Sequence, residues 1–94
     1  MANSTLQGLR NWKAENAGKY GIVEMGVFGS VARGEETAES DVDVVVTMEK
    51  PNLLVRIRIK RELEEYLKKS VDVVHKGDGS HYLDKRIERE MVVV

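Results

Sequence analysis

Two aspartates separated by a single residue, Asp41 and Asp43, introduce an apolar run in the segment "DVDVVV". Side chains two positions apart on a β-strand point to the same face, with about 6.6 Å between their Cα atoms. The two carboxylates can therefore converge on one hard cation, and Mg²⁺ is the natural occupant of such an oxygen-rich site. The metal would compensate two like charges that otherwise repel each other and are costly to desolvate.

A third carboxylate, that of Asp72, occurs in a similar context, one residue into the apolar segment "VDVV". If this segment forms a strand beside the first one, Asp72 joins the same cluster. Three carboxylates can hold two divalent ions, which act together in in-line phosphoryl or nucleotidyl displacement. Each acidic residue also has a simpler interpretation, as a turn or surface residue or as the solvated end of a strand.

The segment before the aspartate pair, "FGSVAR", has residue types that suit phosphate binding. Gly29 lets a phosphate approach the backbone, and the Ser30 hydroxyl can add a donor to backbone N–H groups at the start of a short turn or helix. Arg33 either contacts phosphate or pins the loop to the acidic cluster. A Gly-Ser pair alone is weak support, because such pairs also mark ordinary turns.

Helices and strands must position these residues. Hydrophobic periodicity predicts strands ending near Phe28 and over 41–48, 70–75 and 91–94, the second of them central in the sheet, and helices over about 4–17, 52–69 and 81–90. We expect Gly18 to end the first helix and residues 77–80 to form a turn. Residues 52–69 also contain a strand-like alternation, but their length favours a helix. The predicted fold class is α+β, with a small mixed sheet and helices packed against it, in one domain covering 1–94.

The composition narrows the class of protein. The chain has 94 residues, no cysteine and a formal net charge of −1, which predicts a soluble globular protein without disulfides or thiolate metal sites. It contains no apolar run long enough for a membrane span and no basic excess that would indicate nucleic-acid binding. We expect a cytoplasmic location. His75 and His81 match no zinc spacing and are interpreted as ordinary loop residues, although His75 is near enough to Asp72 in sequence to border the site.

The segment "GSVARGEETAESDVDVVV" resembles the Gly-Ser-x-Ala-Arg-Gly…Ser-Asp-x-Asp signature of minimal nucleotidyltransferases, a branch of the DNA polymerase β-like superfamily. The resemblance extends over most of the chain after residue 20. The residues that match the signature are Gly29, Ser30, Ala32, Arg33, Gly34, Ser40, Asp41 and Asp43.

The resemblance implies a polymerase β-like fold and a role for each of these positions. Asp41, Asp43 and Asp72 would ligate two Mg²⁺ ions, and Asp72 would also help to activate the attacking hydroxyl. The nucleotide-binding residues would be Gly29, Ser30, Arg33 and Ser40, with the first two holding the β- and γ-phosphates of ATP.

Proteins of this minimal type resemble antitoxins paired with HEPN-domain RNase toxins, so the resemblance implies transfer of AMP from ATP to a tyrosine of a cognate toxin. Two alternatives stay open. One is a catalytically silent module that neutralises its partner by contact, and the other is a nucleotidyltransferase acting on a small molecule or RNA. The apolar end "MVVV" either forms an edge strand of the sheet or offers an edge to a partner, in a homo-oligomer or in a complex with the toxin.

Overall fold

The fold is described here by a computed structural model, which covers residues 4–37, 39–76 and 81–94. The predicted turn at 77–80 and the side chain of His81 lie outside the described part. In chain order the elements are α1 (Ser4–Tyr20), β1 (Ile22–Phe28), α2 (Ser30–Arg33), β2 (Val42–Met48), α3 (Leu53–Leu67), β3 (Val71–His75), α4 (His81–Glu90) and β4 (Val92–Val93). The predicted α+β class is confirmed.

The four strands form one mixed sheet in the order β3-β2-β1-β4. β1 pairs antiparallel with β2 and with β4, whereas β2 and β3 run parallel. β2 therefore lies inside the sheet, as its valine-rich sequence predicts. A strand that has neighbours at both edges and is covered on both faces has few polar positions. β4 lies at the edge, so the terminal valines pair within the sheet.

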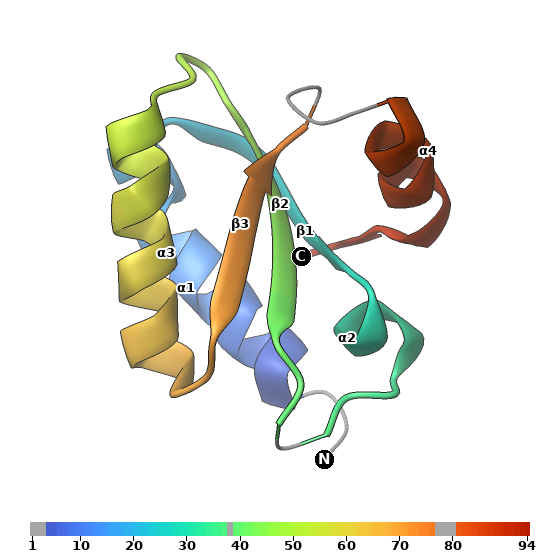
Figure 1. Ribbon diagram of the computed structural model, residues 1–94. Coiled ribbons are helices and arrows are strands. Elements are labelled where there is room, and N and C mark those ends of the chain that lie inside the picture. Colours follow the sequence, from blue (N-terminus) through green and yellow to red (C-terminus); the bar gives the residue numbers. More distant parts are fainter. Residues whose placement is uncertain (1–3, 38, 77–80) are drawn as a thin grey trace.

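Helices cover the two faces of the sheet unequally. Figure 1 shows α1 and α3 on one side and the shorter α2 and α4 on the other. The main core lies under α1 and α3 and includes Leu9, Ile59 and Leu63 against Val44 and Val46. A smaller cluster on the opposite face consists of Phe28, Val45 and Ile87. Because residues alternate along a strand, Asp43 shares this second, thinly covered face with Val45.

The prediction that Gly18 ends the first helix is wrong. α1 continues to Tyr20, and the chain turns at Gly21, which has a φ of 65°. This left-handed conformation favours glycine, whereas Gly18 lies in ordinary helical backbone. The last turn of the helix is retained because Tyr20 stacks on Trp12, with 6.1 Å between ring centroids, and donates a hydrogen bond to Glu62.

α3 begins and ends on recognisable caps. The side chain of Asn52 accepts a hydrogen bond from the Val55 N–H at 3.2 Å, which satisfies one of the unpaired donors of the first turn. The helix ends at Lys68 in a left-handed conformation. None of the helices in the described ranges is long and apolar enough to cross a membrane.

Candidate active site

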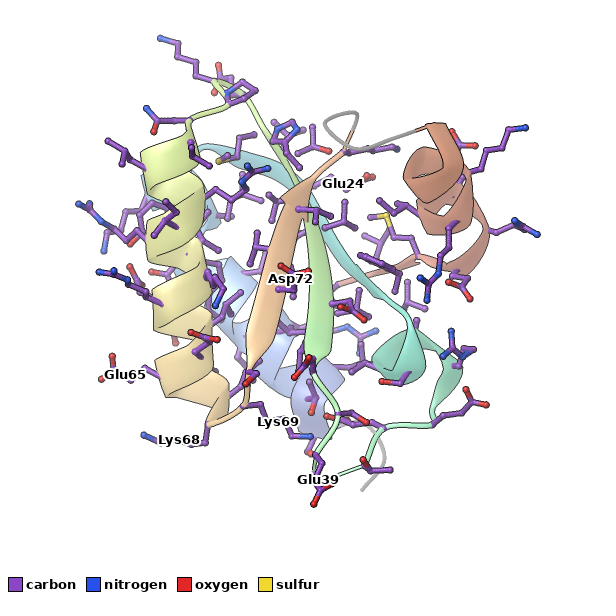
Figure 2. The ribbon with its side chains drawn as sticks, in the orientation of Figure 1. Glu24, Glu39, Glu65, Lys68, Lys69 and Asp72 are labelled. Carbon is purple, nitrogen blue, oxygen red and sulfur yellow. The ribbon has the colours of Figure 1, made fainter. Side chains whose placement is uncertain are left out.

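Two of the three predicted acidic residues lie side by side on neighbouring strands. Asp43 and Asp72 are Cα partners in the parallel pairing of β2 with β3, and adjacent strands lie about 4.8 Å apart. Figure 2 shows Asp72 on β3, beside β2. Asp41 immediately precedes β2, two residues before Asp43. The condition on which the sequence prediction of a cluster depended, that the third strand neighbours the second, is therefore met.

The charges around Asp43 are unbalanced. Burial raises the pKa of the Asp43 carboxyl, and the negative charges of Asp72 and, more weakly, Asp41 raise the pKa further. The guanidinium groups of Arg86 and Arg33 act in the opposite direction but do not reverse the shift. A carboxylate whose ionised form is disfavoured in this way gains most from a bound cation.

This donor set fits a hard divalent cation. Carboxylate oxygens are the ligands that Mg²⁺ prefers, and the repulsion at Asp43 is the kind of cost that a bound cation removes. Across the described ranges, no three Asp, Glu or His side chains stand close enough to enclose an ion by themselves. Mg²⁺ commonly keeps waters and substrate phosphates among its six ligands. A site that offers each ion only one or two protein carboxylates is therefore consistent with Mg²⁺.

Gly29 forms the wall of the site next to Asp43. Its backbone has a φ of 75° and a ψ of −146°, a region open almost only to glycine. A Cβ atom placed on Gly29 would lie 2.6 Å from the Asp43 Oδ2 atom. Glycine is therefore required twice, by the backbone conformation and by the close approach of the carboxylate. Ser30 follows directly and starts α2.

The two remaining predicted nucleotide-binding residues make contacts within the protein. Arg33 donates from Nε to Glu35 at 2.6 Å and from Nη1 to Glu90 at 3.0 Å, which ties α2 to α4. The Ser40 hydroxyl accepts a hydrogen bond from the Thr37 N–H at 2.9 Å. Ser40 thus stabilises the turn that directly precedes Asp41.

Glu36 holds the loop between α2 and β2, and the sequence analysis missed it. Its Oε2 atom accepts a hydrogen bond from the Thr5 hydroxyl at 2.8 Å and forms an ion pair with the Lys69 ammonium group. Lys69 also donates to the Thr37 carbonyl at 3.2 Å. The loop before Asp41 is thereby fixed to α1 and to the segment that enters β3. Glu36 lies in a polar spacer with no periodicity, so the sequence carries no signal for this role.

Replacing Glu36 by glutamine should loosen this loop. The amide keeps the shape of the side chain but loses the ion pair with Lys69, whose side chain is only 21% exposed. A hydrogen bond to a charged group contributes about 1.5–3 kcal/mol, so we expect a lower melting temperature and weaker Mg²⁺ binding. Thermal unfolding and calorimetric titration with Mg²⁺ measure both. Glu39→Gln, an exposed carboxylate of the same loop, is the control, and equal behaviour of the two variants would contradict the anchoring role.

His75 does not border the acidic cluster. It lies three residues beyond Asp72 on β3, a spacing that places it on the opposite face of the sheet. Its Nε2 atom accepts a hydrogen bond from the Met48 N–H at 3.0 Å, and its Nδ1 atom lies 2.8 Å from the Lys76 carbonyl oxygen, to which it donates. The sequence-based suggestion that His75 borders the site is therefore wrong, and the residue has a structural role at the far ends of β2 and β3.

Residues 9–94 match the family model described as "Nucleotidyltransferase domain". The chain belongs to the nucleotidyltransferase family. A protein adenylyltransferase, MntA, of Thermococcus cleftensis is 41% identical to this nucleotidyltransferase over the full length of both chains. A candidate protein adenylyltransferase of Methanocaldococcus jannaschii is 42% identical over 77 residues, covering 81% of this chain and 83% of its own.

Solved structures show the same fold. A candidate minimal nucleotidyltransferase superposes with a TM-score of 0.84 at 35% identity, covering 100% of this chain and 97% of its own. A chain of a Shewanella oneidensis complex, described as a tri-AMPylated HEPN toxin with its MNT antitoxin, matches with a TM-score of 0.74 at 17% identity, over 99% of this chain and 71% of that one. The predicted family, polymerase β-like fold and enzyme class of this nucleotidyltransferase are confirmed.

Proposed function

We propose that this nucleotidyltransferase is a Mg²⁺-dependent protein adenylyltransferase that transfers AMP from ATP to a tyrosine hydroxyl of a cognate HEPN-type RNase toxin and so acts as its antitoxin. The observation that carries the proposal is the register of Asp43 with Asp72, with Asp41 two residues upstream. The full-length similarity to a protein adenylyltransferase supports the choice of donor and acceptor class.

Each residue of the site has a part in the proposed reaction. Asp41, Asp43 and Asp72 would hold two Mg²⁺ ions, which when bound stabilise negative charge on the entering and leaving oxygens. Asp72, exposed on β3, accepts the proton of the attacking hydroxyl. The hydroxyl oxygen forms a bond to the α-phosphorus while the bond between that phosphorus and the bridging oxygen to the β-phosphate breaks, and pyrophosphate leaves.

The donor phosphates are proposed to lie along the end of β1. Gly29 lets the backbone approach the β- and γ-phosphates, the Ser30 hydroxyl donates to them, and Arg33 supplies positive charge. Ser40 acts from the other side of the loop by fixing the turn before Asp41. The site is built at one end of β1 and β2, so the donor and the metals are held by adjacent strands.

The acceptor is proposed to arrive on another protein. Residues 1–94 are proposed to form a single minimal domain, and Asp43 and Asp72 share the thinly covered face of its sheet with Val45 and Val74. Solved complexes of proteins with this fold include a toxin–antitoxin pair with the ATP analogue AMP-PNP, which supports a nucleotide site that functions next to a bound partner. We propose a cytoplasmic location for the reaction, where its proposed donor ATP is abundant.

Co-expression with the protein encoded beside it tests this proposal. We expect the partner to gain the mass of one or more AMP groups, mapped by peptide fragmentation to tyrosine, and to lose its RNase activity. The matched control is the Asp41→Asn/Asp43→Asn double variant, which should bind the partner without modifying it. If the double variant silences the toxin as well as the wild type does, inhibition is by contact, and the adenylyltransferase proposal is wrong.

A further inference from the structure

A single carboxylate on α4 holds two arginines from different elements. The Glu90 Oε1 atom accepts a hydrogen bond from the Arg33 Nη1 at 3.0 Å, and its Oε2 atom accepts one from the Arg86 Nε at 2.9 Å. Arg33 ends α2, whereas Arg86 and Glu90 are one turn apart on α4. The carboxylate thus fixes two guanidinium groups relative to each other, and we call these two residues the arginine pair.

The arginine pair lies beside the acidic cluster. The guanidinium carbon of Arg86 is 5.8 Å from the centroid of the Phe28 ring, and Phe28 is the cross-strand partner of Asp43 in the β1–β2 ladder. Phe28 also directly precedes Gly29, so Arg86 is placed above the strand end that leads into the proposed phosphate loop. The positive charges of both arginines partly offset the raised pKa of Asp43, in agreement with this placement.

The way Arg86 is held suits it to bind an anion. Its bond to Glu90 runs through Nε, which is one of the five N–H donors of a guanidinium. The four donors of the terminal amino groups diverge from that edge and can engage phosphate oxygens in a forked geometry. The cation–π contact with Phe28 and the hydrogen bond to Glu90 hold the guanidinium group from two sides, so less side-chain freedom is lost when an anion binds.

We propose that Arg86 is a second polyphosphate contact of this nucleotidyltransferase and that Glu90 is the residue that positions it together with Arg33. This inference rests on the proposed function, because it assigns the arginine pair to the β- and γ-phosphates of the same donor. Arg86 and Arg33 approach from α4 and α2, and they neutralise the charge that accumulates on pyrophosphate as it leaves.

Binding of Mg²⁺-pyrophosphate tests the inference without relying on turnover. By calorimetry, Arg86→Ala should weaken pyrophosphate binding about tenfold, the factor that corresponds to one charged hydrogen bond. Glu90→Gln should weaken it by a smaller factor, because both arginines stay present but lose their fixed geometry. Binding of AMP, which lacks the β- and γ-phosphates, should be unchanged in both variants. Arg89→Ala, an exposed arginine of the same helix, is the matched control and should bind pyrophosphate like the wild type.

The variant Arg86→Lys distinguishes the loss of the guanidinium donors from a loss of folding. It keeps the charge and the aliphatic part of the side chain but lacks the forked donors. We expect it to fold with an unchanged circular dichroism spectrum and to bind pyrophosphate between the wild type and Arg86→Ala. Equal pyrophosphate affinity in the wild type and Arg86→Ala would overturn the inference while leaving the proposed function intact. Failure of the wild type itself to bind Mg²⁺-pyrophosphate would overturn the proposed donor site, and with it the inference.

Discussion

Replacing Asp43 by asparagine should abolish nucleotidyl transfer and at the same time raise the melting temperature of the metal-free protein. The loss of activity follows from removing the carboxylate that is paired with Asp72 across the strands and lies two residues from Asp41, and we expect about a thousandfold, the upper range for removing one group that stabilises transition-state charge. The gain in stability follows from the raised pKa of Asp43, because burial and the charge of Asp72 disfavour its ionised form in the folded state.

The pH dependence of this effect has a defined sign. A carboxyl whose pKa is higher in the folded than in the unfolded protein destabilises the fold at pH values above the raised pKa, and the penalty disappears below the ordinary pKa of aspartate. The melting temperature of the metal-free wild type should therefore approach that of Asp43→Asn as the pH falls through this window. At neutral pH, Mg²⁺ should raise the melting temperature of the wild type but not that of the variant.

Thermal unfolding with and without Mg²⁺, together with a transfer assay, measures both parts of this prediction. Glu39→Gln removes a carboxylate from the exposed loop and should leave the Mg²⁺ effect intact. A melting temperature of metal-free Asp43→Asn below that of the wild type would show that Asp43 stabilises the fold, and the interpretation of the site as an uncompensated metal-binding cluster would fail.

Replacing Gly29 by alanine should reduce transfer about a hundredfold while the protein still folds. The new Cβ would lie 2.6 Å from the Asp43 Oδ2 atom, so the carboxylate must move, and a displacement of about 1 Å can cost this factor in rate. The positive φ of Gly29 adds a strain of about 1–3 kcal/mol for a residue with a side chain.

A second glycine separates strain from displacement of the carboxylate. Gly21 has a φ of 65°, and a Cβ there would meet its nearest neighbour, on Glu49, at an ordinary 3.9 Å. It precedes β1, whereas Gly29 follows the other end of that strand. Gly21→Ala should therefore lose stability on a similar scale and keep its transfer rate per folded molecule. Equal rates for the two variants would show that the Gly29–Asp43 contact has no part in catalysis.

The side-by-side placement of Asp43 and Asp72 could be predicted once the third strand was assumed to neighbour the second. Asp43 and Asp72 each occur near the start of a valine-rich segment, and two such strands in a parallel pair bring equivalent positions together. The end of α1 could not be placed from the sequence, because Gly18 and Gly21 are equally plausible helix ends. Only the backbone conformation distinguishes them, since Gly21 has a positive φ and Gly18 does not. The stacking of Tyr20 on Trp12 keeps the helix intact as far as Tyr20.

The contacts that support the site could not be predicted from sequence patterns, because they join residues far apart in the chain. Glu36 meets a partner 31 residues away in Thr5 and one 33 residues away in Lys69, and Arg33 meets Glu90 at a separation of 57 residues. Hydrophobic periodicity reports only which side of an element faces the core, so it carries no information about pairs of polar groups on different elements. Charged residues in a mixed helix such as α4 are usually solvated, which concealed the role inferred for Arg86.

Transfer of label from ATP to the purified cognate partner tests the central claim most directly. With the label on the α-phosphate and Mg²⁺ present, the partner should become labelled, and the label should be lost on addition of EDTA and in the Asp41→Asn/Asp43→Asn variant. With the label on the γ-phosphate, the partner should stay unlabelled and the label should appear in pyrophosphate. Transfer of the γ-label to the partner, or no α-label on a partner that the wild type nevertheless inhibits, would contradict the assignment of this chain as a protein adenylyltransferase.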